Sequence, residues 1–227
     1  MEREIEAIHR KVSEIRSGRE AGFSVASIPA FATTVLPRAI VELRRVRPKS
    51  TLKVEVWRTE RIIAELDAGR VDIGLIHSSS ENVPSGFKII ASSPLKCVLP
   101  PGHRLCNADV VKAKDLRNER LIAYHNSLEF ADMFWRMIES LDPMPEIVVE
   151  ASQSALVRDL VRYRVGITLL DGFTASDTML NDMVVKPFEP HLPFHLAMAS
   201  RGSRLSADAR DFLSILTGTA TEIAAGR

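Results

Sequence analysis

The chain has 227 residues, of which 45% are hydrophobic and 26% are charged, and its formal net charge at pH 7 is +1. This composition is typical of a globular protein, and the length allows one large domain or two small ones, of which we expect two. A nearly neutral chain has no overall electrostatic field that would attract nucleic acid, an acidic substrate or a membrane surface.

Cysteine usage and the N-terminal residues bear on the cellular location. The 2 cysteines, Cys97 and Cys106, are too few for a disulfide framework and lack the paired spacing of a zinc site. The N-terminal residues form no apolar run typical of a signal peptide, and no stretch reaches the ~18 apolar residues that a membrane span needs. We therefore expect a cytoplasmic protein with no membrane contact.

Residues 1–19 carry a narrow helical stripe, in which Ile5, Ile8, Val12 and Ile15 recur at spacings of three and four with charged residues between them. An isolated helix of this length is marginal in water, so the stripe suits packing against a partner helix. The pattern predicts a linker helix that supports a homodimer or tetramer. An amphipathic helix that lies on its own domain fits the stripe equally well.

From Gly22 the sequence alternates between strand and helix patterns. It predicts a long helix that begins near Pro29 and is buried as far as Val46, and a second helix with Thr59 as its N-cap. The predicted strands of this part are 23–26, 52–56, 72–76, 88–91 and 95–99. Parallel strands joined by helices are typical of an α/β sheet.

After Pro100-Pro101-Gly102 a similar order begins again. The predicted elements are strands 121–124, 147–149, 166–170, 184–187 and 195–199, and helices 129–141, 154–163 and one near the C-terminus. The fold class is therefore α/β, with two Rossmann-like subdomains joined by two crossovers. We place subdomain I at 20–98 and 194–227 and subdomain II at 99–193, with a cleft between them.

Small polar residues stand at four predicted strand-to-helix junctions. They are Ser27-Ile28-Pro29-Ala30, Arg58-Thr59-Glu60, His125-Asn126-Ser127 and Ser152-Gln153-Ser154. Ligands of open α/β sheets gather at the carboxyl ends of strands, where helix N-termini present unpaired N–H groups and positive dipole ends. Any one of these junctions is typical of an ordinary helix cap. Four junctions that converge on one cleft favour a ligand that carries a carboxylate.

Motifs of enzymes are missing from the sequence. It contains no Gly-x-Ser-x-Gly elbow, no Walker loop, no Gly-x-Gly-x-x-Gly after a strand and no His-Glu-x-x-His pair. His103 and Cys106 are close in sequence, yet two possible ligands do not make a zinc site. We expect no catalytic residues, no cofactor and no metal. A hydrolase or transferase that uses His77 or His125 as a base is the least favoured interpretation.

Three segments resemble the effector-binding half of LysR-type transcriptional regulators. They are Val35-Leu36-Pro37-Arg38, Leu66-Asp67-Ala68-Gly69-Arg70-Val71-Asp72 and Val98-Leu99-Pro100-Pro101-Gly102-His103-Arg104-Leu105. The resemblance covers nearly the whole chain and implies a fold like that of type 2 periplasmic binding proteins, with a small-molecule effector between the subdomains. It also implies that DNA is bound only through an N-terminal helix-turn-helix domain, which this chain does not contain.

The resemblance implies a set of ligand-binding residues, because the family commonly holds the anionic group of the effector at the first strand-to-helix junction. Carried over, the set comprises Ser27, Pro29, Ala30, Thr59 and His77 from subdomain I, and Tyr124, Asn126, Ser127, Ser152, Gln153, Asp171 and Phe173 from subdomain II. Glu60, at a helix start, and Asp171, at a strand end, are candidate partners for an amino or guanidino group of the effector.

Within the family, the likeness is to regulators of opine catabolism. It depends on the first junction, on Ala68–Gly74, and on Ser154–Arg158 leading to Gly166–Asp171. One departure is Arg164, where such relatives often have glycine at a helix end that favours positive φ. The sequence thus predicts a sensor of a small, opine-like carboxylate. The alternative is a free-standing type 2 solute-binding protein, against which the missing signal sequence and the linker stripe count.

Overall fold

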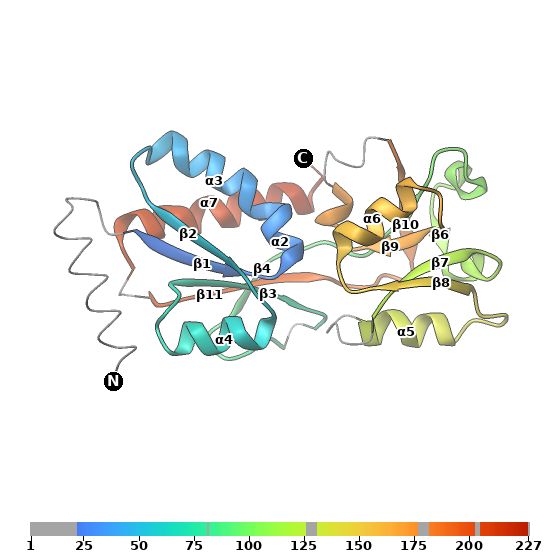
Figure 1. Cartoon of the computed structure of the whole chain (residues 1–227), viewed down its shortest axis with the longest axis horizontal. Helices are drawn as coiled ribbons and strands as arrows, with labels where there is room; N and C mark the ends of the chain where they lie inside the picture. The colour runs from blue at the N-terminus through green and yellow to red at the C-terminus, as the bar shows by residue number, and fades with distance from the viewer. Residues whose placement is uncertain (1–21, 81, 126–130, 177–181, 203–204, 227) are drawn as a thin grey trace.

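The computed structural model describes residues 22–80, 82–125, 131–176, 182–202 and 205–226. These residues form two lobes that lie end to end along the long axis of the molecule (Figure 1). Among them, no helix has the length and apolar character that crossing a membrane requires. The predicted linker helix at 1–19 lies outside the described residues.

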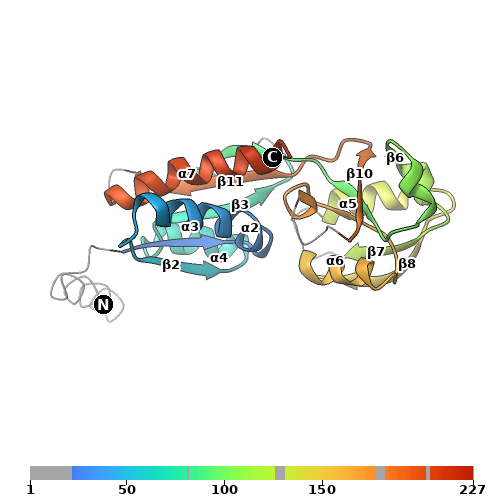
Figure 2. The same ribbon diagram turned by 90° about the horizontal axis from the view of Figure 1, so that it is seen from above.

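Lobe I is built on a five-stranded sheet with the strand order β2-β1-β3-β11-β4. Its strands are β1 (Phe23–Ser27), β2 (Leu52–Val56), β3 (Ile73–Ser78), β4 (Lys88–Ser92) and β11 (His195–Ser200). Strands β2, β1 and β3 are parallel, and their carboxyl ends point toward lobe II (Figures 1 and 2). Helices α3 (Val35–Val46) and α7 (Ala207–Ala224) cover one face of the sheet, and α4 (Thr59–Asp67) covers the other.

Lobe II contains a four-stranded sheet of order β6-β10-β5-β9 and a two-stranded parallel sheet of β7 and β8. The strands are β5 (Lys96–Leu99), β6 (Val111–Lys112), β7 (Arg120–Tyr124), β8 (Glu146–Ala151), β9 (Thr168–Leu170) and β10 (Val184–Glu189). A parallel bridge between Leu121 and Ile167 connects the two sheets. Helices α5 (Ala131–Glu139) and α6 (Ser154–Arg162) lie on opposite sides of β7 and β8 (Figure 1).

Two crossover segments form the hinge between the lobes, one from β4 to β5 and the other from β10 to β11. They are hydrogen-bonded to each other, because Ser93 N donates to Phe194 O at 3.0 Å and Leu95 N donates to Leu192 O at 2.9 Å. The sequence predicts that subdomain I continues through residue 98. In the structure β5 pairs with β9 and β10, so the chain enters the lobe II sheet before this strand.

The long helix predicted after Pro29 is wrong in two respects. It is divided into a short helix, α2 (Pro29–Thr33), and α3, with Thr34 between them. Pro37 explains the break, because it has no N–H to donate to the carbonyl of Thr33 and its ring would clash with that carbonyl. Val46 is 60% exposed, so the buried stripe of α3 ends before its last residue.

Two helix ends show how local sequence determines the boundaries. The N-cap of α4 is Arg58 rather than the predicted Thr59, which is the first helical residue. At the end of α6, Arg164 takes the left-handed conformation with a φ of 59°. It thus occupies the conformation for which glycine is favoured, although it is not glycine.

Candidate functional site

The first two strand-to-helix junctions are tied together at the edge of lobe I that faces lobe II. Ser27 is fully buried at the end of β1, and its carbonyl accepts a hydrogen bond from Trp57 N at 3.0 Å. Ile28 N in turn donates to the carbonyl of Leu75 in β3 at 3.3 Å. The Ser27 hydroxyl donates to the Ile28 carbonyl at 3.0 Å. The ends of β1, β2 and β3 therefore form one connected edge.

Helix α4 begins at this same edge. Thr59 is half-buried and Glu60 is exposed in its first turn. The guanidinium of Arg61 lies over the Trp57 ring, 4.2 Å from its centroid. This edge therefore presents a hydroxyl, a carboxylate and an aromatic surface capped by a cation.

His77 of β3 is buried behind this edge and stacks on Phe194, with 3.8 Å between the ring centroids. Burial lowers the pKa of His77 to about 3, so its imidazole is neutral near pH 7. An imidazole with so low a pKa is a weak general base. The burial of His77 and its low pKa therefore give no support to the interpretation in which it acts as the base of a hydrolase or transferase.

Three phenylalanine rings connect the lobes and the hinge, and we call them the hinge aromatic cluster. Phe31 of α2 contacts Phe173, which follows β9, at a centroid distance of 5.3 Å, and it contacts Phe194 at 5.9 Å. The rings of Phe173 and Phe194 are 6.3 Å apart. All three side chains are buried. One ring comes from each lobe and the third from a crossover, so a change in lobe angle must move them relative to one another.

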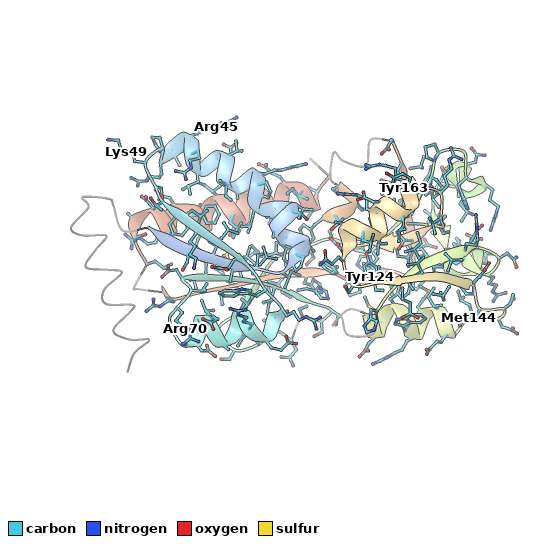
Figure 3. All side chains as sticks on the ribbon, viewed as in Figure 1. Arg45, Lys49, Arg70, Tyr124, Met144 and Tyr163 are labelled. Carbon is cyan, nitrogen blue, oxygen red and sulfur yellow. The ribbon has the colours of Figure 1, made fainter. Side chains whose placement is uncertain are left out.

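In lobe II, Tyr124 and Asp171 are brought close together. Tyr124 ends β7, is fully buried and lies near the boundary between the lobes in Figure 3. Burial raises the pKa of Tyr124, and the negative charge of Asp171 raises it further. The Asp171 side chain accepts a hydrogen bond from Thr174 N at 2.8 Å, and burial raises the pKa of this carboxyl group.

The other lobe II candidates lie at the starts of α5 and α6. His125 N donates to the carbonyl of Ala151 at 3.1 Å, which places these two junctions side by side. Ser152 is exposed, and Gln153 is the N-cap of α6 but makes no side-chain capping bond. Asn126 and Ser127 lie outside the described residues. Each lobe therefore presents a pair of joined junctions.

The structure brings the sequence candidates into two groups, one at the edge of each lobe, and connects them through the hinge aromatic cluster. Pro29 is exposed and Ala30 is half-buried in α2, the lobe I helix that contacts α6 of lobe II. Sequence reasoning did not find Phe31 or Phe194 as parts of this region. The available signals were the position of Phe31 after the first junction and of Phe194 just before the second crossover ends.

The polar atoms of the two groups determine which ligands the region suits. Hydroxyl and amide groups come from Ser27, Thr59, Ser152 and Gln153, and an exposed carboxylate comes from Glu60. Within the described ranges, no three His, Cys, Asp or Glu side chains form a group that could hold a metal ion. The arrangement suits a small polar ligand that lies against a buried aromatic surface.

Comparison with known proteins identifies relatives of this chain. Residues 16–221 match the family described as LysR substrate binding domain. The transcriptional activator protein LysR of Escherichia coli is 25% identical over 196 residues, which are 86% of this chain and 62% of the relative. The octopine catabolism/uptake operon regulatory protein OccR of Rhizobium meliloti is 30% identical over 174 residues, which are 75% of this chain and 57% of the relative.

Solved structures support the fold. The reduced regulatory domain of OxyR from Pseudomonas aeruginosa superposes with a TM-score of 0.70 at 21% identity, covering 88% of this chain and 96% of that one. The CcmR regulatory domain of Synechocystis, in complex with 2-PG, superposes with a TM-score of 0.71 at 15% identity, covering 88% and 98%. These similarities confirm the predicted α/β fold of type 2 periplasmic-binding-protein plan.

Proposed function

Because this chain belongs to the LysR substrate binding domain family, we propose that it is the sensing part of a LysR-type transcriptional regulator. Its ligand would be a small amino-acid-derived carboxylate of opine type, bound between the lobes. The opine assignment is supported by the similarity to OccR and by a 23% identity over 194 residues to the regulatory protein NocR of Agrobacterium tumefaciens. The observation that carries the sensor proposal is the pair of joined junctions on each side of the hinge aromatic cluster.

Residues of both groups would contact the effector. Thr59 from lobe I, with Ser152 and Gln153 from lobe II, would hydrogen-bond the carboxylate of the effector. The Ser27 hydroxyl would join them by turning away from the Ile28 carbonyl, to which it donates in this structure. Glu60 would face its amino or guanidino group, since opposite charges form the stronger hydrogen bonds. An effector held by both lobes favours the lobe angle at which both groups reach it, provided that its affinity differs between two states.

In the whole protein, the effector and DNA would be bound by different parts. The two lobes would be the two subdomains, with the boundary at the crossovers rather than after residue 98. This chain spans 57% of the length of OccR and 62% of the length of LysR. DNA would be bound by another part of the protein, in the cytoplasm, and the lobe angle would be communicated to that part.

We also propose that the chain forms a homodimer or tetramer. Apolar side chains are exposed on both lobes: Val54 and Val56 are 39% and 50% exposed on the edge strand β2, and Tyr163 after α6 is 78% exposed (Figure 3). In a dimer with two-fold symmetry, lobe I of each copy would contact lobe II of the other copy. The apolar patches of both lobes would then be covered in both copies. Sedimentation of the chain with Val54→Lys should show weakened association, and a monomeric wild-type chain at tens of micromolar would contradict the proposal.

The effector assignment is tested with a thermal-shift screen of octopine, nopaline, arginine, aromatic acids and sugar phosphates. A ligand at a hundredfold excess over its Kd should stabilise the protein by roughly 2.7 kcal/mol. Ser27→Ala should lower its affinity by on the order of 1 kcal/mol, because one polar contact is lost. Ser214→Ala, an exposed position on α7, is the matched control and should bind normally.

Stabilisation by aromatic acids or sugar phosphates alone would contradict the opine assignment but leave the sensor proposal in place. Full affinity of the Ser27→Ala variant would place the carboxylate elsewhere in the cleft.

A further inference from the structure

A pocket of about 820 Å³ lies at the hinge, and we call it the hinge pocket. Its lining comes from both lobes and from the crossover itself: Arg38 of α3 and Gly226 after α7, residues 94–96, and β10. None of the sequence candidates for the effector cleft that fall within the described residues lines it. The hinge pocket is therefore distinct from the proposed effector cleft.

The lining of the hinge pocket is largely apolar. Leu95 comes from the crossover, and Val185 and Phe188 come from β10 of lobe II. The volume falls within the range of roughly 300–1,000 Å³ that is typical of small-molecule sites. Leu95 and Phe188 are almost fully buried, so the apolar surface open to a ligand comes mainly from Val185 and from two further lining residues, Pro94 and Pro187.

Lys96 supplies a positive charge to this pocket. It is the first residue of β5, it is half-buried, and its Nζ donates to Ser176 Oγ at a distance of 3.4 Å. Burial lowers the pKa of Lys96, and no carboxylate of the described chain acts on it in the opposite direction. An ammonium partly removed from water without a counter-ion is unfavourable, so an anion in the pocket would be attracted to it.

Arg38 brings a second positive charge to the lining, but from an exposed position on α3 where water screens it, whereas Lys96 is half-buried. Ser176 Oγ donates its own proton to the carbonyl of Gly172 at 2.6 Å, so it has no proton to offer a carboxylate. Glu189 is exposed at the rim, and its carboxylate lies 3.6 Å from Nζ of Lys112. His191 is also exposed at the rim. An ammonium has three donors, and Ser176 occupies one of those of Lys96.

We propose that the hinge pocket is a second ligand site, which takes a monocarboxylate with an apolar aliphatic body. The carboxylate accepts hydrogen bonds from Lys96, and the body lies against Pro94, Val185 and Pro187. Because the ligand contacts both lobes and a crossover, it favours the lobe arrangement in which these surfaces are this close. The site would thus act on the same hinge as the effector, from a separate pocket, so the two ligands would change each other's affinity.

Calorimetric titration of the whole chain with octanoate tests the proposal, with octan-1-ol and octylamine as probes that have the same body and no negative charge. Octanoate should bind more tightly than either. Lys96→Met should weaken octanoate binding about tenfold or more, because a charged hydrogen bond is lost while the length of the side chain is kept. Lys88→Met, an exposed position on β4 that does not line the pocket, should leave binding unchanged.

A second variant tests the apolar part of the site. Val185→Trp narrows the pocket while keeping Lys96, so it should weaken octanoate and octan-1-ol together. This variant also covers the case in which Lys96→Met fails to fold.

Crystals soaked in 8-bromooctanoate then locate the ligand through the anomalous signal of bromine, which should lie beside β10. Bromine in the effector cleft, equal affinities of the Lys96→Met and Lys88→Met variants, or no octanoate binding by the wild-type chain would each overturn the hinge-pocket proposal. None of these outcomes bears on the test of the effector cleft with Ser27→Ala.

Discussion

Replacing Arg164 by glycine should stabilise the protein, because Arg164 occupies a backbone conformation that disfavours a side chain. Its φ is 59°, and it is the only non-glycine residue of the described chain with positive φ. The end of α6 has the hydrogen bonds of a Schellman motif: Arg164 N donates to Val161 O at 2.9 Å and Val165 N donates to Leu160 O at 3.1 Å. The motif therefore holds Arg164 in this conformation at a steric cost.

The magnitude follows from two opposing effects. A non-glycine residue in the left-handed region costs roughly 1–2 kcal/mol, which glycine would not incur. Glycine also makes the unfolded chain more flexible, and this effect removes about 0.4–1 kcal/mol of the gain. The Arg164 side chain is exposed, so little packing is lost. We expect a net stabilisation of about 0.5–1 kcal/mol, which in a chain of this size raises the Tm by roughly 1–4 °C.

Urea denaturation of the wild type, Arg164→Gly and Arg164→Ala measures the effect. Arg164→Ala removes the charge and keeps the Cβ atom, so it should remain close to the wild type. If alanine stabilises the protein as much as glycine does, the cause is the charge of Arg164 and not its backbone conformation.

Two further predictions concern buried rings near the hinge. Since burial lowers the pKa of His77 from 6.5 to about 3, the unfolded chain binds more protons between these values, and the free energy of unfolding should fall as pH drops through this interval. The contribution of His77 is up to ~1.4 kcal/mol per pH unit, and urea titrations should show a shallower acid loss for His77→Phe; an unchanged slope would contradict the assignment. Phe31→Ala should destabilise the chain by about 3–5 kcal/mol, because it leaves a cavity between Phe173 and Phe194. Phe31→Leu fills most of that space, so an equal loss in both variants would argue against a packing effect.

The sequence alone determines the order of elements, because strand and helix periodicities are local. The parallel βαβ order, the end of α4 before Gly69 and the helix end at Arg164 are each readable from a few neighbouring residues. The break between α2 and α3 is readable as well, since Pro37 removes a hydrogen bond four residues upstream. The prediction of one long helix did not take Pro37 into account, because the apolar spacing continues through Thr34.

Tertiary structure alone decides which distant residues meet. Phe31, Phe173 and Phe194 belong to three segments far apart in the sequence, and no periodicity relates them. The same holds for the membership of β5, whose apolar residues fit either sheet until β9 and β10 pair with it. Lys96 looks like any lysine at the start of a strand. Only the packed hinge partly buries it with no carboxylate of the described chain acting on it, which is why we propose it as the partner of an anion.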